Sequence, residues 1–363
     1  MTGADASARF VREAHHQVRD LLVARPRRYW CDFLLTMLVA YAAFALYISA
    51  PDWSLSQAGG LVVCGLAMFR AVVFTHELAH RRGRAFASFA VCWNVLCGIP
   101  FLMPSFLYGD HKGHHSSDVY GTWSDPEYIM HTPTWRWRIA AFLLLPAVYP
   151  VLAVVRFVVL TPLALTSRSV DRLVWTCASS LYVMNESYRR EYDREASARS
   201  RWLQELACCA WGWAIALLVV AGRIDWATIE KTYLVFLFWI VVNQVRTLVA
   251  HRYANGTDTP ISYVDQLLDT NTFPYGRVLP ELWAPVGLRY HALHHLLPTL
   301  PYHSMRLAHE RLMAKLPAGS PYHRTIKRGL WSALMATLLN RERPAAPRLA
   351  ESPERQARRR GAG

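Results

Sequence analysis

The sequence predicts an all-α integral membrane protein that carries a histidine-rich cap on one side of the bilayer. Apolar residues make up 53% of the 363 residues, and they gather into runs of about 17 to 27 residues. A helix needs ~20 apolar residues to cross the ~30 Å hydrocarbon core of a bilayer, so several runs are long enough. A soluble protein with buried core helices is the alternative, but such helices are seldom this long and uninterrupted.

Four runs have the length of a transmembrane helix, and they form two hairpins. The first hairpin joins residues 30–50 to residues 59–75, and the second joins residues 206–221 to residues 232–250. Residues 86–106 are also mainly apolar, but an asparagine and two prolines interrupt them. We expect this stretch to form a buried or interfacial helix pair rather than a span.

A fifth apolar run, residues 139–165, is broken by three prolines and by Arg156. Arginine-rich stretches lie before the first span, after the second span and on both sides of the second hairpin, and the positive-inside rule puts all of them in the cytoplasm. Four crossings then place both termini in the cytoplasm, and residues 139–165 form a re-entrant or interfacial hairpin buried against protein. Two crossings within this run would give six in total, which is the alternative.

The chain is basic, with 40 lysines and arginines against 26 acidic residues and a formal net charge of +14. Such a balance can indicate nucleic-acid binding, but here the positive residues flank the apolar runs. We therefore assign the charge to topology, to contact with membrane lipid headgroups and to an acidic partner protein, and we expect no nucleic-acid partner. The expected location is a bacterial-type inner membrane. The expected domains are a polar N-terminal segment (1–29), a membrane domain (30–339) and a disordered basic tail (340–363).

Eight of the fifteen histidines fall in three five-residue boxes, HELAH (76–80), HKGHH (111–115) and HALHH (291–295). Residues i and i+4 of a helix share a face, so the first box can bind one ion or two neighbouring ions. In each HxxHH box the i and i+3 histidines face one way, and the adjacent histidine points about 100° away, toward a second ion. The boxes predict a two-metal site with the ligands His76, His80, His111, His114, His115, His291, His294 and His295.

A ninth histidine, His251, ends the fourth predicted span. Thr247 and Asn243 lie one and two helical turns before it, so the three side chains form a polar stripe on an otherwise apolar helix. Polar groups within a span usually face an interior site rather than lipid. We expect His251 to be a ninth ligand, with Asn243 and Thr247 beside the metals. A stripe that only hydrogen-bonds a neighbouring helix is the alternative.

Nine candidate ligands exceed the four that a structural zinc site needs, so they indicate two ions. Imidazole binds Zn, Cu, Fe and Ni alike, but zinc has no redox chemistry, whereas iron at such a site can activate O₂. We therefore predict two iron ions, with O₂ as co-substrate. Polar side chains near the boxes are expected to orient the imidazoles; they are Glu77, Asp110, Asp118, Asp125, Glu127, Asp265, Asp269 and His303.

Three other classes of protein fit these boxes less well. HELAH also matches the HExxH motif of zinc metalloproteases, but such an enzyme needs one further ligand and leaves two boxes without a role. A haem-bearing electron carrier would have histidines on facing spans at different depths. A metal transporter would place charged ligands near the middle of the bilayer, whereas these boxes lie at or beyond the ends of the predicted spans.

The three boxes, in this order and between hydrophobic hairpins, resemble the histidine boxes of membrane fatty acid desaturases and related hydroxylases. The segments GTWSDPEY (121–128) and HHLLPTLPYH (294–303) resemble the acyl-desaturase branch, and the resemblance covers roughly residues 30–315. It implies that the eight box histidines ligate two irons and that His251 is an extra ligand. Some family members have an asparagine one turn before that extra ligand. This chain has Thr247 there, with Asn243 a turn further back.

The resemblance implies an O₂-dependent enzyme that introduces a double bond into a fatty acyl chain, presented as a lipid or as an acyl thioester. Hydroxylases and alkene-forming decarboxylases share the same motifs, so both reactions stay open as alternatives. A narrow apolar tunnel between the spans would hold the chain. We recognise no electron-transfer module, so a separate ferredoxin-, rubredoxin- or cytochrome b5-like donor is expected to dock on the basic cytoplasmic face.

Overall fold

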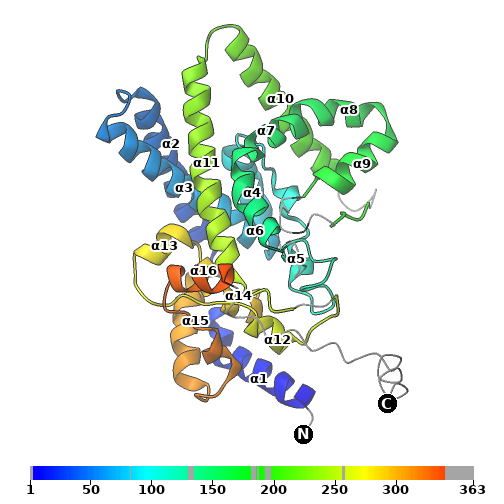
Figure 1. Cartoon of the computed structure of the whole chain (residues 1–363), viewed down its shortest axis with the longest axis vertical. Helices are drawn as coiled ribbons and strands as arrows, with labels where there is room; N and C mark the ends of the chain where they lie inside the picture. Colours follow the sequence, from blue (N-terminus) through cyan, green and yellow to red (C-terminus); the bar gives the residue numbers. More distant parts are fainter. Residues whose placement is uncertain are drawn as a thin grey trace, which may run out of the picture.

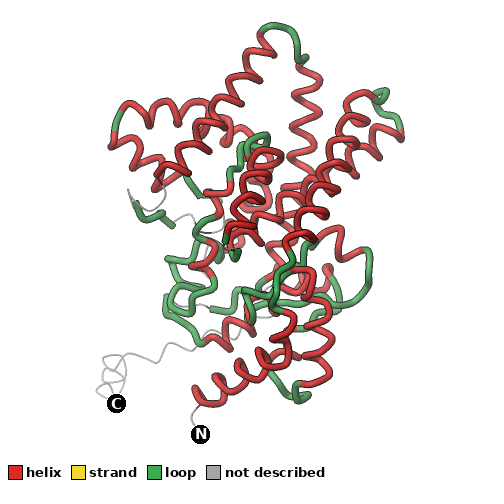
Figure 2. The backbone as a smooth tube through the Cα atoms, turned by 180° about the vertical axis from the view of Figure 1, so that it is seen from behind, coloured by secondary structure: helices red, strands yellow, loops and turns green. Residues whose placement is uncertain are grey.

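The structure is a computed structural model that describes residues 3–81, 83–129, 135–180, 185, 188–192, 198–255 and 258–339. Within these ranges the regular structure is helical, apart from the isolated bridges His251–Thr270 and Thr272–Ile326. Figure 2 shows helices joined by loops throughout. The all-α prediction is confirmed. The predicted basic tail, residues 340–363, lies outside the described residues.

Five helical segments are long and apolar enough to cross a membrane, and they occupy the upper part of Figure 1. Side chains on their outer faces are apolar; Leu38 is 67% exposed and Val220 is 85% exposed, which suits contact with lipid rather than water. This arrangement is that of an integral membrane protein, and the number of crossings stays a prediction. The segments are α2 (Pro26–Ser49), α3 (Leu55–Ala79), Tyr149–Thr166, Arg199–Val220 within α10 (Ala198–Val220), and α11 (Trp226–Ala250).

Local sequence explains where the two predicted hairpins turn. Pro26 opens α2, where a missing backbone N–H costs nothing. The Ser54 hydroxyl accepts a hydrogen bond from the Gln57 backbone at 3.1 Å and starts α3. The Asp225 carboxylate accepts one from the Thr228 backbone at 2.8 Å and starts α11. Four of the five apolar segments therefore coincide with the four predicted spans.

The irregular run after residue 135 is a chain of short helices rather than one rod. It passes through α6 (Trp135–Leu144), a 3₁₀ turn (Leu145–Ala147), α7 (Tyr149–Val154), a π turn (Val155–Leu160) and α8 (Thr161–Thr166), followed by α9 (Arg168–Ala178). Arg156 is buried there and donates to Glu205 of α10 at 2.9 Å. The fifth apolar segment, Tyr149–Thr166, lies within this run. Its predicted role as a re-entrant or interfacial hairpin stays a prediction.

Close packing of α3 against its neighbours sets the position of the histidine boxes. Gly65 of α3 lies against the ring of Phe238 of α11, and a Cβ at this position would lie 2.2 Å from that ring. Phe69 and Trp239 are among the buried residues of the same core. Because α3 and α11 end on the same side of the molecule, the first box and His251 come together there.

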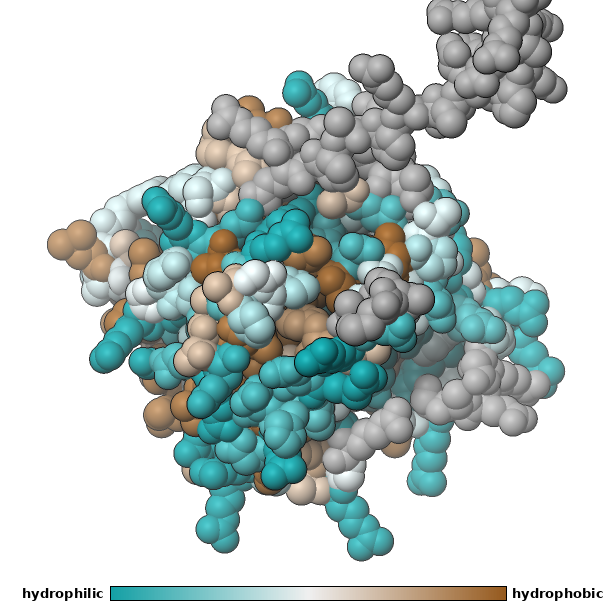
Figure 3. Space-filling model, turned by 90° about the horizontal axis from the view of Figure 1, so that it is seen from below, coloured by the Kyte–Doolittle hydropathy of each residue, from teal (hydrophilic) through white to brown (hydrophobic). Residues whose placement is uncertain are grey.

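The lower part of the molecule covers these helix ends. It contains α12 (Tyr263–Leu268), α13 (Leu279–Trp283), α14 (His291–Leu296), α15 (Tyr302–Lys315), α16 (Leu330–Leu338) and the N-terminal helix α1 (Gly3–Val18) (Figure 1). Val18 of α1 and Leu312 of α15 belong to one buried cluster. Figure 3 shows that hydrophilic side chains dominate this end. The histidine boxes thus lie between an apolar and a polar half; the cytoplasmic location of the polar half stays a prediction.

Candidate metal centre

The structure brings the nine predicted histidines together in two clusters. The five-histidine cluster contains His76, His80, His111, His115 and His294, and the four-histidine cluster contains His114, His251, His291 and His295. Within each cluster, one ring nitrogen from every histidine lies within 4.8 Å of the others. Each cluster is therefore compact enough to hold one metal ion.

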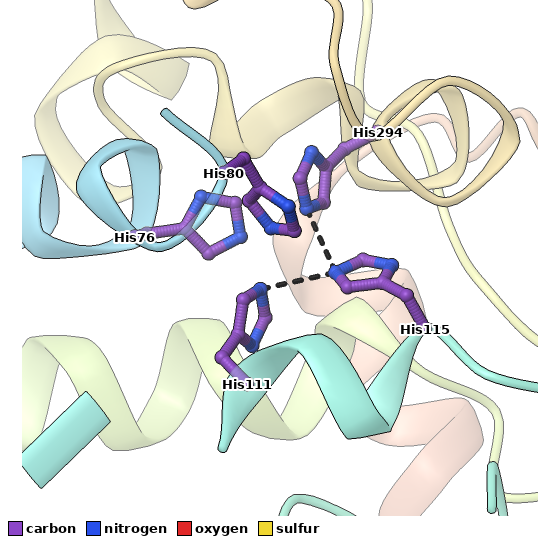
Figure 4. Close-up of side chains that lie close together, drawn as sticks. All are labelled: His76, His80, His111, His115 and His294. Atoms are coloured by element: carbon purple, nitrogen blue, oxygen red, sulfur yellow. Dashed lines mark hydrogen bonds between the residues drawn. The ribbon is translucent and has the colours of Figure 1, made fainter. Parts of the chain in front are cut away.

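Four segments supply these side chains. The first box lies on the last turn of α3, with His80 as the residue that ends the helix. The second box forms the short helix α5 (His111–His114), the third box forms α14, and His251 ends α11. Figure 4 shows the five rings of the larger cluster converging from α3, α5 and α14. Gly287, with φ of +78°, makes the tight turn before α14; a Cβ there would lie 2.5 Å from the Met305 sulfur.

The two HxxHH boxes divide their histidines between the clusters in opposite ways. His111 and His115 join the five-histidine cluster and His114 the other, whereas His291 and His295 join the four-histidine cluster and His294 the other. The paired residues are thus i and i+4, not the expected i and i+3. At 3.6 residues per turn, i+4 is rotated by roughly 40° and i+3 by roughly 60°, so the i+4 pair shares a face better.

Distances between ring nitrogens fit bound ions. In the five-histidine cluster, the Nε2 atom of His115 lies 3.0 Å from those of both His111 and His294 (dashed in Figure 4). In the four-histidine cluster, Nε2 of His251 lies 2.9 Å from that of His291 and 3.3 Å from that of His114. Imidazoles bound at ~2.0–2.1 Å to one ion have neighbouring nitrogens roughly 3.0–3.4 Å apart. Both clusters match that spacing.

Unpaired ring nitrogens give a second test of the fit. Within the described residues, both ring nitrogens of His76 and Nε2 of His80 are buried without a hydrogen-bond partner. Buried polar atoms in folded proteins normally have partners, because an unmade hydrogen bond is costly. Metal ions would bind such nitrogens, and an all-imidazole set suits iron, zinc, copper or nickel. The residues present therefore fit two ions.

The four-histidine cluster is held from outside by carboxylates and a tyrosine. His114 donates from Nδ1 to Asp125 at 2.8 Å. His251 donates from Nδ1 to the Tyr120 hydroxyl at 2.8 Å, and that hydroxyl donates to Asp269 at 2.7 Å. These bonds put the ring proton on Nδ1 and leave Nε2 free to face the metal.

Hydrogen bonds to the other ligands are fewer. The amide of Gln266 lies 3.1 Å from Nδ1 of His295 in the four-histidine cluster. In the five-histidine cluster, His111 donates from Nδ1 to Glu127 at 2.6 Å. Within the described residues it is the one member of that cluster with a carboxylate bonded to its ring. The two clusters therefore differ in how firmly their rings are oriented.

Burial keeps most of these imidazoles neutral, the form that binds metal. It lowers the pKa of His80 to about 2, and with the neighbouring imidazoles it lowers the pKa values of His115, His251, His291, His294 and His295 well below 6.5. Burial acts in the same direction on His114, but the Asp125 carboxylate outweighs it and raises the pKa of that ring.

The two flanking carboxyls shift in opposite directions. Burial opposes ionisation of Glu127, but the facing His111 outweighs it and lowers the pKa of Glu127 to about 2. Burial raises the pKa of Asp269 to about 6, despite the hydrogen bond from Tyr120. Glu127 is thus the firmly ionised partner of its histidine.

Glu77, inside the first box, lies away from the ligand rings. Its carboxylate accepts hydrogen bonds from the Tyr29 hydroxyl, from Arg81 at 3.1 Å and from the Tyr302 backbone at 3.4 Å. None of these partners is an imidazole, so the contacts do not support its predicted orienting role. They also do not support a metalloprotease, in which this glutamate must reach a metal-bound water.

The remaining predicted orienting residues bond elsewhere within the described part of the chain. Asp110 pairs with Arg190 at 3.2 Å, and Asp265 accepts from Ser262 at 2.7 Å at the start of α12. The ring of His303 accepts from the Arg25 backbone at 3.2 Å. Asp118 is exposed. Their role beside the metals stays a prediction, as does that of Asn243 and Thr247.

Sequence reasoning missed Tyr120 and Gln266. Tyr120 and Gln266 contact ligand rings, as described above. Neither tyrosine nor glutamine indicates metal binding in a sequence. Gln266 also lies far in the sequence from the third box, whose His295 it contacts. Only their nearness to the boxes in space reveals them.

A hollow with about 830 Å³ of empty volume lies between α3 and α11 and reaches the five-histidine cluster. We call it the α3–α11 cavity. Its walls are apolar at one end and polar near His76. The lining includes Val72, His76, Tyr108, Glu127, Trp239, Asn243, Arg246 and Thr247. The predicted polar stripe of Asn243 and Thr247 therefore faces this cavity.

Comparisons with known proteins agree with this geometry. Residues 52–326 match the family model described as fatty acid desaturase. A curated protein of Caulobacter vibrioides, named ceramide hydroxylase, is 36% identical over 335 residues, which cover 92% of this chain and 93% of that protein. The chain therefore belongs to the fatty acid desaturase family, within the superfamily that also contains hydroxylases.

Proposed function

We propose that this protein is an O₂-dependent hydroxylase that acts on a ceramide-type lipid, at a carbon close to the lipid's polar groups. One observation carries the proposal: the end of the α3–α11 cavity that meets His76 is its polar end, lined by Asn243, Arg246 and Thr247. The similarity to a ceramide hydroxylase supports it. The sequence resemblance favours desaturation, which stays a prediction.

Polarity at the metal end separates the two reactions. A chain attacked far from its head group would pass the metals as plain hydrocarbon, so an apolar wall would suit it better there. A ceramide carries an amide and hydroxyl groups within a few carbons of one another. Attack next to those groups places lipid oxygen atoms against polar side chains, among them the buried Nε of Arg246, which has no hydrogen-bond partner among the described residues.

The reaction would insert one oxygen atom of O₂ into a C–H bond and reduce the other oxygen atom to water, consuming two electrons and two protons. Two irons, bound by the nine histidines, would supply the activation of O₂. The chain itself orients the imidazoles through Asp125, Glu127 and the Tyr120–Asp269 pair. The cavity holds the target carbon beside the five-histidine cluster, so that proximity selects the position attacked.

Desaturation of an acyl chain is the second candidate, favoured by the apolar end of the cavity around Val72 and Trp239. Either reaction needs electrons from outside. We propose a separate ferredoxin-, rubredoxin- or cytochrome b5-like donor on the polar half of the molecule, with that half in the cytoplasm of a bacterial-type cell.

The test uses detergent-purified protein expressed in iron-rich medium. Iron is counted per chain, and the protein is then incubated with a ceramide, a reducing system and ¹⁸O₂. About two irons and a product that carries one ¹⁸O atom would support the proposal. A product lighter by two hydrogens, without ¹⁸O, would establish desaturation instead. Zinc without iron would overturn the oxidative mechanism.

Matched variants keep this test specific. His291→Ala removes a member of the four-histidine cluster, and His16→Ala removes an exposed histidine of α1 that lies outside both clusters. We expect the first variant to lose metal and product and the second to keep both. Equal loss in both variants would show that the assay reports folding rather than the metal site.

A further inference from the structure

Arg246 is a cation of α11 that faces the α3–α11 cavity. Its Nη2 donates to the Asn243 side chain at 2.9 Å. Its Nε is buried and has no hydrogen-bond partner among the described residues. An arginine has five N–H donors in a planar fork, and a buried donor without an acceptor is unfavourable. The side chain therefore lines the cavity with a donor that no described acceptor satisfies.

Other buried arginines near the apolar helices behave differently. Arg156 donates to Glu205 at 2.9 Å, and Arg201 pairs with both Asp171 and Glu205. By contrast, no carboxylate of the described residues is in ion-pair contact with Arg246. Glu127 lines the same cavity, but its carboxylate is bonded to His111 at 2.6 Å. Within the described residues, the Nε donor of Arg246 is thus left without an acceptor.

The position of Arg246 along α11 determines how close a partner bound to it would lie to the metals. Arg246 lies five residues before the candidate ligand His251, which is roughly 7–8 Å along a helix axis. Trp239, at the apolar end of the cavity, lies seven residues further back, roughly 10 Å away. A lipid oxygen held by Arg246 would therefore leave only a few carbons between itself and the metals, while the hydrocarbon extends toward Trp239.

We propose that Arg246, with Asn243 beside it, binds an uncharged oxygen acceptor of the lipid, an amide carbonyl or a hydroxyl, and thereby selects the carbon that is oxidised. The ligand class is a neutral polar lipid, because the Glu127 carboxylate lines the same cavity and would repel an anionic group held by Arg246. This inference rests on the proposed function for the identity of the lipid. It does not depend on which oxidation follows binding.

Binding is tested first, on the iron-loaded protein without O₂ or reductant, so that the result is independent of the reaction. The probes are a short-chain ceramide and the free fatty acid of the same acyl chain, each measured by displacement of a fluorescent lipid. Arg246→Gln should weaken ceramide binding by roughly 10–100-fold, the range expected for a hydrogen bond to a charged group. Arg246→Lys should recover part of it. Arg223→Gln, at an exposed arginine between α10 and α11, should bind as the wild type does.

Two binding results would overturn the inference. In one, Arg246→Gln binds the ceramide as tightly as the wild type. In the other, the variant loses affinity for the fatty acid but not for the ceramide, which would make the ligand a carboxylate. Unchanged thermal unfolding and iron content of Arg246→Gln would show that a loss of ceramide affinity is not caused by misfolding.

Product position is the second readout, since a merely structural arginine would not change it. The wild type should give one positional isomer, and Arg246→Gln should give several, with KM raised more than kcat is lowered. A single unchanged isomer would overturn the positioning role. If the wild type desaturates instead, the proposed hydroxylation fails, but loss of ceramide binding in Arg246→Gln would still support this inference.

Discussion

The five-histidine and four-histidine clusters use the same side chain in two different settings. All four histidines of the smaller cluster are buried. The Nδ1 atoms of three of them contact another side chain, which is Asp125, Tyr120 or Gln266. The larger cluster has one more ligand, but His80 and His115 are partly exposed. Only His111 of that cluster has a carboxylate bonded to its ring within the described residues.

This difference indicates that the larger cluster relies on the number of its ligands and the smaller cluster on their fixed orientation. The four-histidine cluster compensates for fewer ligands with rings that are fixed before metal binds, because outer hydrogen bonds set tautomer and ring direction. The five-histidine cluster would hold its ion with more ligands, and fewer hydrogen bonds orient its rings. It is also the cluster whose His76 lines the α3–α11 cavity, so it lies where substrate would be oxidised.

Removing one ligand from each cluster should have the largest effect. His291→Ala leaves three ligands in the smaller cluster, whereas His294→Ala leaves four in the larger one. We expect His291→Ala to lose about one metal per chain and essentially all activity, a greater loss than the roughly 10–100-fold that an outer partner costs. His294→Ala should retain more metal. Metal analysis and single-turnover product yield measure both, and more metal in His291→Ala than in His294→Ala would contradict the comparison.

Substitution of the outer carboxylates should come next in size. Asp125 accepts from His114 and also from the Gly121 and Glu127 backbones at 2.8 and 2.9 Å, so it holds both a ligand and a loop. Glu127 bonds only one ligand, His111. Asp125→Asn should weaken metal binding by about 100-fold and Glu127→Gln by about 10-fold, the two ends of the usual range for such partners.

Graded chelation followed by metal analysis would measure that pair of variants. The exposed Glu13 of α1 provides a matched control, and Glu13→Gln should bind metal as the wild type does. Equal losses in Asp125→Asn and Glu127→Gln would mean that outer contacts do not distinguish the clusters.

The sequence predicted which histidines lie together but not how they are divided between the two clusters. Box spacing and the polar stripe before His251 were enough to select all nine histidines that the structure brings together. They could not show that α5 and α14 contribute in opposite proportions. That division depends on how two short helices pack against α3, and spacing within one helix says nothing about the position of the next.

The bilayer made the long helices predictable from the sequence. Long apolar runs between arginines identify α2, α3, α10 and α11, because the bilayer imposes helix length. Residues 139–165 were harder, since their prolines break the run into short helices and Arg156 is satisfied by Glu205, a residue distant in sequence. Arg246 was missed because one arginine in an apolar helix has no motif.

Metal-free protein should lose stability as the pH falls, and one ligand, His114, should contribute with the opposite sign. Six ligands, one of them His80, have pKa values lowered by burial, so the unfolded chain binds more protons below about pH 6.5 and stability decreases there. His114 has a raised pKa and contributes in the opposite direction, with stability that is lost as the pH rises. Asp125→Asn removes that opposing contribution.

Thermal unfolding of the metal-free protein between pH 8 and pH 5 would measure this. The midpoint should fall below about pH 6.5, it should fall more steeply in Asp125→Asn, and bound metal should flatten the curve. A midpoint that rises on acidification would contradict the burial of neutral imidazoles.

Tyr120→Phe should give the smallest change, because it removes one hydroxyl from the four-histidine cluster and keeps the ring. His251 would lose the acceptor of its Nδ1 proton, and Asp269 would lose the donor at 2.7 Å while keeping the Ala254 backbone at 2.6 Å. Metal affinity should fall by about 10-fold, the low end for an outer partner. Tyr233→Phe, whose hydroxyl contacts the Ala147 backbone on the lipid-facing part of α11, is the control. If Tyr120→Phe were as damaging as His291→Ala, orientation would matter as much as ligand number, and this distinction between the clusters would have to be abandoned.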